Sequence, residues 1–218
     1  MTERFDRRVV PDSVLEFLRA CARRVPFHLG GGAALAGVFL RHRKSRDVDL
    51  FSHDHDAHRE VVRALPAAAT DAGGNFALIR DAGGHVRGKL TIGDVELEVD
   101  AVHEALPDIE SPPATVEGIT VESLTDLRAA KLTCLLSRRE PRDLVDVLFL
   151  ERAGFRPEAD LELALQKDAG IDPAILAWLI AEFPSEPLPE MLKPLTRIEF
   201  ERYRDELAHR LRAVALKT

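Results

Sequence analysis

The sequence predicts an α/β (α+β) fold, with a small mixed-sheet domain followed by a mainly helical domain. Segments with the alternation typical of β-strands lie in the first half of the chain, whereas the second half shows the apolar spacing of helices. A proline-containing connection at residues 107–113 separates the two patterns. We therefore expect an α/β domain at residues 1–115 and a helical domain at residues 116–218 that completes a cleft.

The first domain is expected to alternate helices with strands. Apolar residues at helical spacing in 14–18 predict a first helix, which Pro26 ends before a short strand. Gly83-Gly84 and Gly93-Asp94 separate three later strands and are typical of hairpin turns. The expected strands are 27–29, 47–51, 75–80, 86–92 and 95–102, and the further helices are 33–40 and 57–69.

The second domain follows a short strand expected at 119–121. Its apolar residues recur at helical spacing, and the prolines between 184 and 194 predict a stiff link before the last helix. The expected helices are 123–138, 142–153, 159–167, 173–183 and 195–216.

Composition narrows the class of protein. The chain has 218 residues, 45% of them hydrophobic, which is enough for a sizeable core. A formal net charge of -7 excludes a general nucleic-acid coat, although arginines cluster at 41–46 and 138–142. Cys21 and Cys134 lie in apolar helical stretches and are expected to be reduced core thiols. Without an apolar secretion signal or a membrane-length apolar run, we expect a soluble cytoplasmic protein.

Two aspartates, Asp47 and Asp49, form the most informative motif. Alternation along the expected strand places both carboxylates on one face, opposite Val48 and Leu50. Carboxylates this close repel each other unless a cation lies between them, and Mg²⁺ prefers such oxygen ligands. The glycines at 30–32 precede an expected helix, whose first backbone N–H groups are available to phosphate. The pattern indicates nucleotide chemistry.

A third carboxylate is expected to join this pair. Glu96, Glu98 and Asp100 share one face of the expected strand at 95–102, and Asp100 lies near its end. If the strands belong to one sheet, Asp100 lies beside Asp47 and Asp49. Three carboxylates around two divalent cations suit in-line transfer of a nucleotidyl group, and one of them can accept the proton of the attacking hydroxyl.

Lys131 is unusual because it lies on the apolar stripe of its expected helix, four residues from both Leu127 and Leu135. A lysine on an inner face must contact an anion or reach water through its stem. The alternatives are a structural ion pair and a triphosphate ligand. Asp143 and Asp146 interrupt the apolar helix that follows, and a salt bridge from either to Lys131 would orient the lysine.

A histidine-rich tract at residues 52–58 offers a competing interpretation. It comes close to the His-x-His-x-Asp-His signature of metallo-β-lactamases, but Ala57 stands where that signature needs aspartate. We expect a solvated helix start there, with a zinc site as the alternative.

Four motifs in order resemble the AbiEii/AbiGii toxin group of nucleotidyltransferases, within the DNA polymerase β-like superfamily. They are the glycine turn at 29–35, the His-Arg-Lys-Ser-Arg-Asp-Val-Asp-Leu-Phe segment at 42–51, the lysine helix at 127–132 and the Arg-Asp-x-x-Asp segment at 142–147. The resemblance covers roughly residues 25 to 150. Ala33 departs from the pattern, because relatives often have threonine there, so backbone N–H groups must hold the phosphates.

The resemblance implies a role for each matching residue. Asp47, Asp49 and Asp100 would bind Mg²⁺ or Mn²⁺, with Asp100 as the base and Lys131 as a further catalytic residue. Residues implied in nucleotide binding are Gly31, Gly32, Arg43, Ser45, Lys131 and Asp143.

The resemblance also implies a function. It implies a toxin that moves an NMP from an NTP to an acceptor hydroxyl of tRNA or another RNA and is paired with a cognate antitoxin. Two other functions stay open. The negative charge suits nucleotidylation of a cationic small molecule such as an aminoglycoside, and the same fold can serve as a non-catalytic nucleotide-binding partner.

Overall fold

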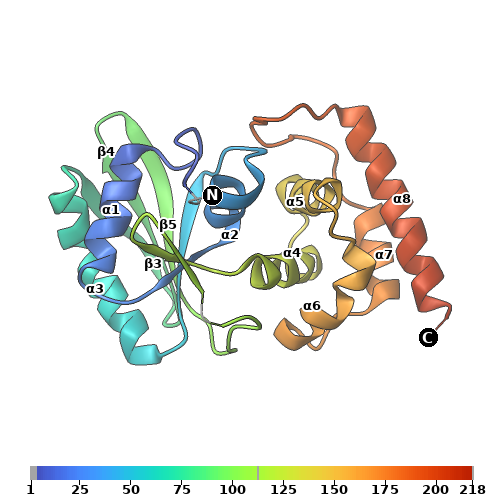
Figure 1. Cartoon of the computed structure of the whole chain (residues 1–218), viewed down its shortest axis with the longest axis horizontal. Coiled ribbons are helices and arrows are strands. Elements are labelled where there is room, and N and C mark those ends of the chain that lie inside the picture. Colours follow the sequence, from blue (N-terminus) through green and yellow to red (C-terminus); the bar gives the residue numbers. More distant parts are fainter. Residues whose placement is uncertain (1–3, 112, 218) are drawn as a thin grey trace. The chain divides into compact units, whose positions relative to one another are not determined.

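The computed structural model describes residues 4–111 and 113–217, which divide into two compact units between Ser123 and Leu124 (Figure 1). Strands at 114–121 belong to the sheet of the first unit, so this division lies a few residues beyond the boundary expected at 115. No helix in these ranges is long and apolar enough to cross a bilayer.

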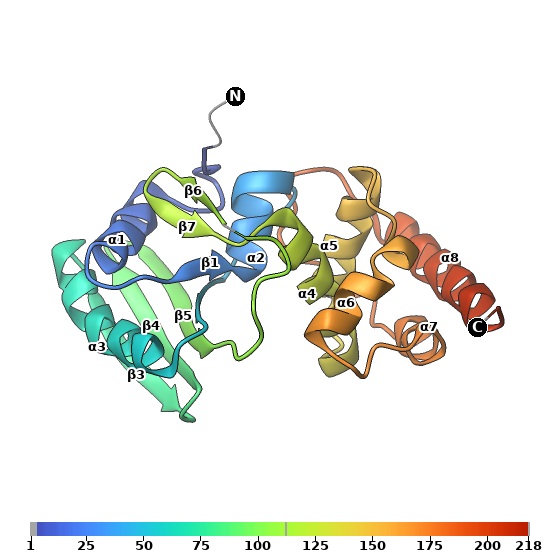
Figure 2. The ribbon, with the colours of Figure 1, turned by 60° about the horizontal axis from the view of Figure 1, so that its bottom comes forward.

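Seven strands of the described residues form one mixed sheet in the order β3-β4-β5-β2-β1-β7-β6 (Figure 2). β2 runs parallel to β5 and β1 runs parallel to β7, whereas the other neighbours are antiparallel. The predicted α/β fold with a mixed sheet is confirmed; β6 is a strand that the sequence patterns missed. The bounds are β1 His28–Gly30, β2 Asp47–Ser52, β3 Asn75–Asp81, β4 His85–Ile92, β5 Val95–His103, β6 Ala114–Val116 and β7 Ile119–Val121.

The helices of the first unit are α1 (Asp12–Ala22), α2 (Gly31–Ala34) and α3 (His55–Asp71). The α3 helix packs against α1 and against strands β2 to β5. The segment expected to be one helix from residue 33 starts two residues earlier and changes at Leu35 into a π-helix, η1 (Leu35–Leu40). A π-helical turn inside a helix is rare and often lies at a functional site.

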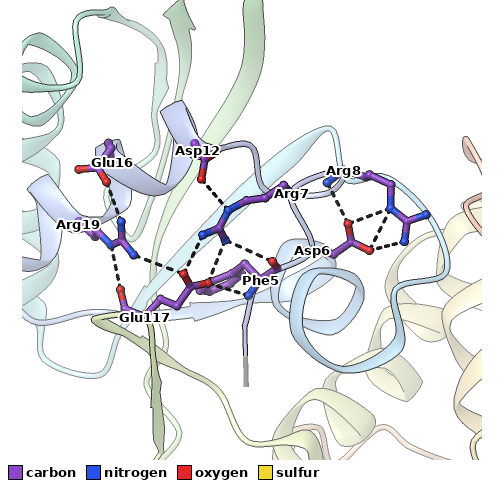
Figure 3. Close-up of polar contacts among 8 residues, drawn as sticks. All are labelled: Phe5, Asp6, Arg7, Arg8, Asp12, Glu16, Arg19 and Glu117. Atoms are coloured by element: carbon purple, nitrogen blue, oxygen red, sulfur yellow. Dashed lines mark hydrogen bonds and ion pairs between the residues drawn. The ribbon is translucent and has the colours of Figure 1, made fainter. Parts of the chain in front are cut away.

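Glu117 in the β6–β7 turn fixes the N-terminal segment of the unit (Figure 3). Its carboxylate accepts hydrogen bonds from both terminal nitrogens of Arg7, at 2.7 and 2.9 Å, and from the backbone N–H of Phe5 at 2.9 Å. Arg19 donates to the backbone carbonyl of Glu117 at 2.9 Å. These contacts, with the Arg7 hydrogen bonds first, lower the pKa of Glu117 to about 2.

The second unit is helical, as predicted. Its α4 helix packs against α5, α6 and α7, and α7 packs against α8. Thr196 and Glu199 form a capping box that starts α8, and Asp172 caps α7. The bounds are α4 Leu124–Ser137, α5 Pro141–Arg152, α6 Leu161–Lys167, α7 Pro173–Ala181 and α8 Arg197–Ala215, with a short 3₁₀-helix η2 at Pro157–Ala159.

Candidate active site

The predicted carboxylates of the first unit lie on two adjacent parallel strands. Asp49 on β2 is the direct neighbour of Asp100 on β5, and Asp47 is the neighbour of Glu98. Neighbouring strands run about 4.8 Å apart, and neighbouring residues point to the same face. Val48 pairs with Val99 on the opposite, buried face. The sheet register therefore brings Asp47, Asp49 and Asp100 to one face, as the alternation in the sequence predicts.

Asp100 is held by two side chains of β4 that the sequence motifs do not predict. Arg87 donates from Nε to Oδ1 at 2.8 Å and from Nη2 to Oδ2 at 3.0 Å. His85 Nε2 lies 2.6 Å from the same Oδ1. Asp100 is only 3% exposed, and these contacts neutralise a carboxylate that burial would otherwise destabilise. The hydrogen bonds to Asp100 are the first cause of a raised pKa at Arg87.

The glycine turn lies against Asp49. Gly31 has φ +60°, the left-handed region that side chains disfavour, and a Cβ added there would collide with the carboxylate of Asp49. Glycine is therefore required twice over, for the backbone angle and for the close approach. The start of α2 therefore lies directly against a carboxylate of β2.

Gly32 connects this turn with two other predicted residues. A Cβ there would lie 2.7 Å from Nη2 of Arg43 and 2.9 Å from Oγ of Ser45. Ser45 also donates a hydrogen bond of 3.1 Å to Oδ1 of Asp47, which orients that carboxylate. The guanidinium of Arg43, 2% exposed as a residue, donates to the carbonyl of Lys44 at 2.9 Å. A fixed cation thus lies beside the helix start.

The predicted residues of the second unit form their own buried cluster. Lys131 Nζ lies 2.8 Å from Oδ2 of Asp146 and 3.5 Å from Oδ1 of Asp143. Arg138 donates to both oxygens of Asp143, at 2.8 and 2.9 Å. The expected salt bridge between Lys131 and the α5 aspartates is present, whereas Arg128 of α4 pairs with Asp160. Both aspartate side chains are fully buried, so the charges of Lys131 and Arg138 are needed for stability.

The donor set of the first unit fits a hard divalent cation. Asp47, Asp49 and Asp100 supply only carboxylate oxygens, which suit Mg²⁺ and Mn²⁺. Asp49 and Asp100 are direct neighbours across β2 and β5. Binding at Asp100 must compete with the Arg87 guanidinium, which occupies the same oxygens.

The histidine-rich tract starts α3, as expected. The side chain of Asp54 caps the helix by accepting from the N–H of Ala57 at 2.8 Å. His58 is buried, and its Nε2 lies 3.2 Å from the carbonyl oxygen of Ala101. Asp54 and His58 therefore have structural roles at the start of α3. His53 lies just before the helix, and its contacts are described below.

Comparisons with known proteins identify the family and the fold. The family described as "Nucleotidyl transferase AbiEii toxin, Type IV TA system" matches residues 16–215. JHP933 from Helicobacter pylori has a TM-score of 0.59 and 21% identity, with 95% of this chain and 92% of that chain covered. MenT4, a nucleotidyltransferase toxin from Mycobacterium tuberculosis H37Rv, has a TM-score of 0.63 and 18% identity, with coverages of 93% and 85%. Identities this low show a shared fold alone, and a comparison with curated proteins gives no match.

Proposed function

We propose a specific reaction for this chain, which belongs to the AbiEii nucleotidyl transferase toxin family of type IV toxin–antitoxin systems. A nucleoside monophosphate passes from an NTP to a hydroxyl group of an RNA acceptor, of which a tRNA is the first candidate. The acceptor oxygen forms a bond to the α-phosphorus, the bond from that phosphorus to the bridging oxygen breaks, and pyrophosphate leaves. The reaction depends on Mg²⁺ or Mn²⁺ and takes place in the cytoplasm.

One observation carries the proposal: the register that places Asp49 beside Asp100 while Gly31 approaches the carboxylate of Asp49. A carboxylate set and a helix start with free N–H groups are the two parts that a metal-bound triphosphate needs.

The residues of the first unit take separate roles in this proposal. Asp47 and Asp49 hold the divalent ion, which when bound supplies neutralising charge to the triphosphate. Asp100 accepts the proton of the acceptor hydroxyl once Arg87 and His85 no longer occupy its oxygens. Ser45 keeps Asp47 oriented through its 3.1 Å hydrogen bond.

Phosphate contacts come from backbone and cationic groups. The N–H groups at Gly31 and Gly32 bind phosphate oxygens, and Arg43 adds a buried positive charge next to Gly32. By the family resemblance we also assign Lys131 and Asp143 to nucleotide binding. Contacts with Asp143 and Asp146 fix the position of the Lys131 ammonium group before any ligand binds, which supports this assignment.

The acceptor and the partner follow from the family. A type IV toxin implies a cognate antitoxin, and the arginine clusters at 41–46 and 138–142 favour a polyanionic acceptor such as RNA. The net charge of -7 favours the second candidate, a cationic small molecule.

A single assay separates these candidates. The protein is incubated with each of four labelled NTPs and Mg²⁺ or Mn²⁺, together with total tRNA, host protein or an aminoglycoside mixture. We expect label in the tRNA fraction and its loss in Asp49→Asn, whereas Glu96→Gln, an amide substitution of an exposed carboxylate on β5, keeps transfer. Melting curves check that both variants fold.

The outcomes are distinct. Label on the drug instead of RNA selects the small-molecule enzyme. NTP binding without transfer to any acceptor selects the non-catalytic partner. An Asp49→Asn variant that is folded and fully active removes the proposed metal site.

A further inference from the structure

Three side chains distant in sequence meet at one edge of the sheet: His28, His53 and Asp108. His28 begins β1 and His53 directly follows the end of β2, which runs antiparallel to β1. Since β5 runs parallel to β2, the segment that follows β5 leaves the sheet at the same edge and carries Asp108. The topology alone therefore gathers two imidazoles and one carboxylate.

Their ligand atoms have the spacing of a metal site. Asp108 Oδ1 lies 3.0 Å from Nε2 of His53, and its Oδ2 lies 3.5 Å from Nδ1 of His28. One ligand atom from each residue falls within 4.8 Å of the other two, in the part of the chain that the structure describes. Bonds of about 2.0–2.2 Å at tetrahedral angles place neighbouring zinc ligands about 3.3–3.6 Å apart. The two distances from Asp108, 3.0 and 3.5 Å, lie close to this range.

The hydrogen bonding of His53 indicates a cation between it and Asp108. Its Nδ1 lies 3.0 Å from the carbonyl oxygen of Glu104, an acceptor only, so Nδ1 must carry a proton. In a neutral imidazole this leaves a lone pair on Nε2, which points at a carboxylate oxygen 3.0 Å away. Two lone pairs at that distance repel unless a proton or a metal ion lies between them. Metal-bound histidines typically donate their other N–H to a carbonyl in this way.

The position of His28 favours a metal ion over protons. The rings of His28 and His53 meet edge to face, with centroids 5.3 Å apart. Nδ1 of His28 lies 3.5 Å from Oδ2 of Asp108, beyond the 2.7–3.2 Å of a good N–H···O hydrogen bond, whereas two ligands of one zinc ion can lie that far apart. One divalent ion satisfies all three ligands. All three side chains are at least partly shielded, with 22%, 30% and 11% exposure for His28, His53 and Asp108.

We propose that His28, His53 and Asp108 form a binding site for a divalent transition metal ion such as Zn²⁺. Imidazole nitrogens suit Zn²⁺ and its transition-metal neighbours, whereas Mg²⁺ prefers oxygen. With three protein ligands the fourth position is left to water. The bound ion would tie the start of β1 to the segment after β5, which otherwise runs exposed at residues 105–107.

This site is separate from the candidate active site. His28 is the strand neighbour of Phe51, two residues beyond Asp49 along β2, or about 7 Å at the usual rise of a strand. No ligand is shared with the carboxylates assigned to the triphosphate. The two sites differ in donor atoms as well, so their metal preferences differ.

Metal titration of the tag-free full chain tests the proposal. After treatment with chelator, the protein is titrated with Zn²⁺ against a competing dye, and with Co²⁺, whose visible absorption reports nitrogen and oxygen ligands. We expect one tight Zn²⁺ per chain and a Co²⁺ band. Asp108→Asn and His53→Gln should each weaken Zn²⁺ binding by more than roughly a hundredfold, since even an outer-shell partner contributes 10–100-fold.

Two controls make the result specific. His55→Ala removes an exposed histidine two residues away, and Asp49→Asn removes a carboxylate of the active site; both should keep the tight Zn²⁺. A wild-type chain that binds Zn²⁺ no better than Asp108→Asn overturns the site, as does a tight Zn²⁺ that only Asp49→Asn removes. Circular dichroism of each chelated variant shows whether it folds, and His53→Gln remains the deciding variant if Asp108→Asn does not.

Discussion

Replacing Arg87 by glutamine should have two effects of opposite sign, on stability and on metal affinity. Arg87 makes two hydrogen bonds to the carboxylate of Asp100, whose side chain is 4% exposed. Removing one partner of a fully buried pair costs about 3–5 kcal/mol. The Arg87 side chain is 40% exposed and His85 still contacts Asp100, so water and the imidazole replace part of the loss. We expect about 2 kcal/mol, or roughly 4–8 °C in Tm.

The same substitution should strengthen binding of Mg²⁺. In the folded chain the guanidinium and a divalent ion compete for the oxygens of Asp100, and their charges repel. Without the guanidinium we expect Mg²⁺ to bind roughly tenfold more tightly, a difference of about 1.4 kcal/mol. Adding Asp100→Asn to Arg87→Gln should abolish this gain, because the contested carboxylate is gone.

Urea unfolding with and without Mg²⁺ measures both effects. The matched control is Lys89→Gln, two residues along β4, where the lysine contacts the exposed Glu96 at 2.7 Å. An exposed ion pair contributes about 0–1 kcal/mol, so this control should change little. If Arg87→Gln is as stable as Lys89→Gln and responds to Mg²⁺ like the wild type, Asp100 is neither held by Arg87 nor a metal ligand.

Three further substitutions test other parts of the structure. Gly31→Ala should reduce nucleotidyl transfer by at least roughly a hundredfold, because the added Cβ displaces Asp49. The control is Gly93→Ala, where φ is also left-handed but the space around the residue is open. This variant should lose about 1 kcal/mol of stability and keep transfer. Lys131→Met should lower the free energy of unfolding by about 3 kcal/mol, as measured in urea, because it leaves buried carboxylates without their lysine; unchanged stability would exclude that role. The pKa of Glu117 is lowered from 4.5 to about 2, which should stabilise the fold by about 1 kcal/mol above pH 4.5 after allowance for screening by solvent. The difference in free energy of unfolding between the wild type and Glu117→Gln should therefore vanish as the pH falls toward about 2. A difference that persists at that pH would contradict the ion pair.

The sequence was sufficient for most elements because their periodicity is strong. The strands at 47–51 and 95–102 alternate apolar and acidic residues, and the structure has β2 and β5 over nearly the same residues. The π-helical segment Leu35–Leu40 could not be predicted, because a helix of either kind presents the same apolar composition. Strand β6 was missed because three residues of an exposed edge carry too short a pattern.

The partner of Asp100 could have been found by counting from a turn. Gly93-Asp94 was predicted to be a two-residue hairpin turn, which pairs Ile92 with Val95. Counting outward from that pair leads to Arg87 opposite Asp100, as the register shows. The hairpin prediction therefore already contained the strongest contact of the candidate active site.

The histidine cluster had no such local signal. His53 and Asp108 are 55 residues apart, and the structure joins them because β2 and β5 run in the same direction. Sequence periodicity gives each strand but not its direction or its neighbour. His53 belongs to the tract at 52–58, but its contacts with His28 and Asp108 lie outside the tract.

Two sites with different donor atoms on one sheet have a consequence for any activity assay. Asp47, Asp49 and Asp100 supply oxygen only, whereas His28 and His53 supply nitrogen, so a nitrogen-donor chelator that ignores Mg²⁺ removes metal from the histidine site alone. If such a chelator abolishes transfer in the presence of excess Mg²⁺, the cause is a displacement of the segment after β5 or of His28 at the start of β1, and not loss of Mg²⁺ from the carboxylates. The glycine turn begins two residues after His28, at Gly30. Displacement of His28 is therefore the shortest route by which loss of the ion could reach the phosphate-binding residues.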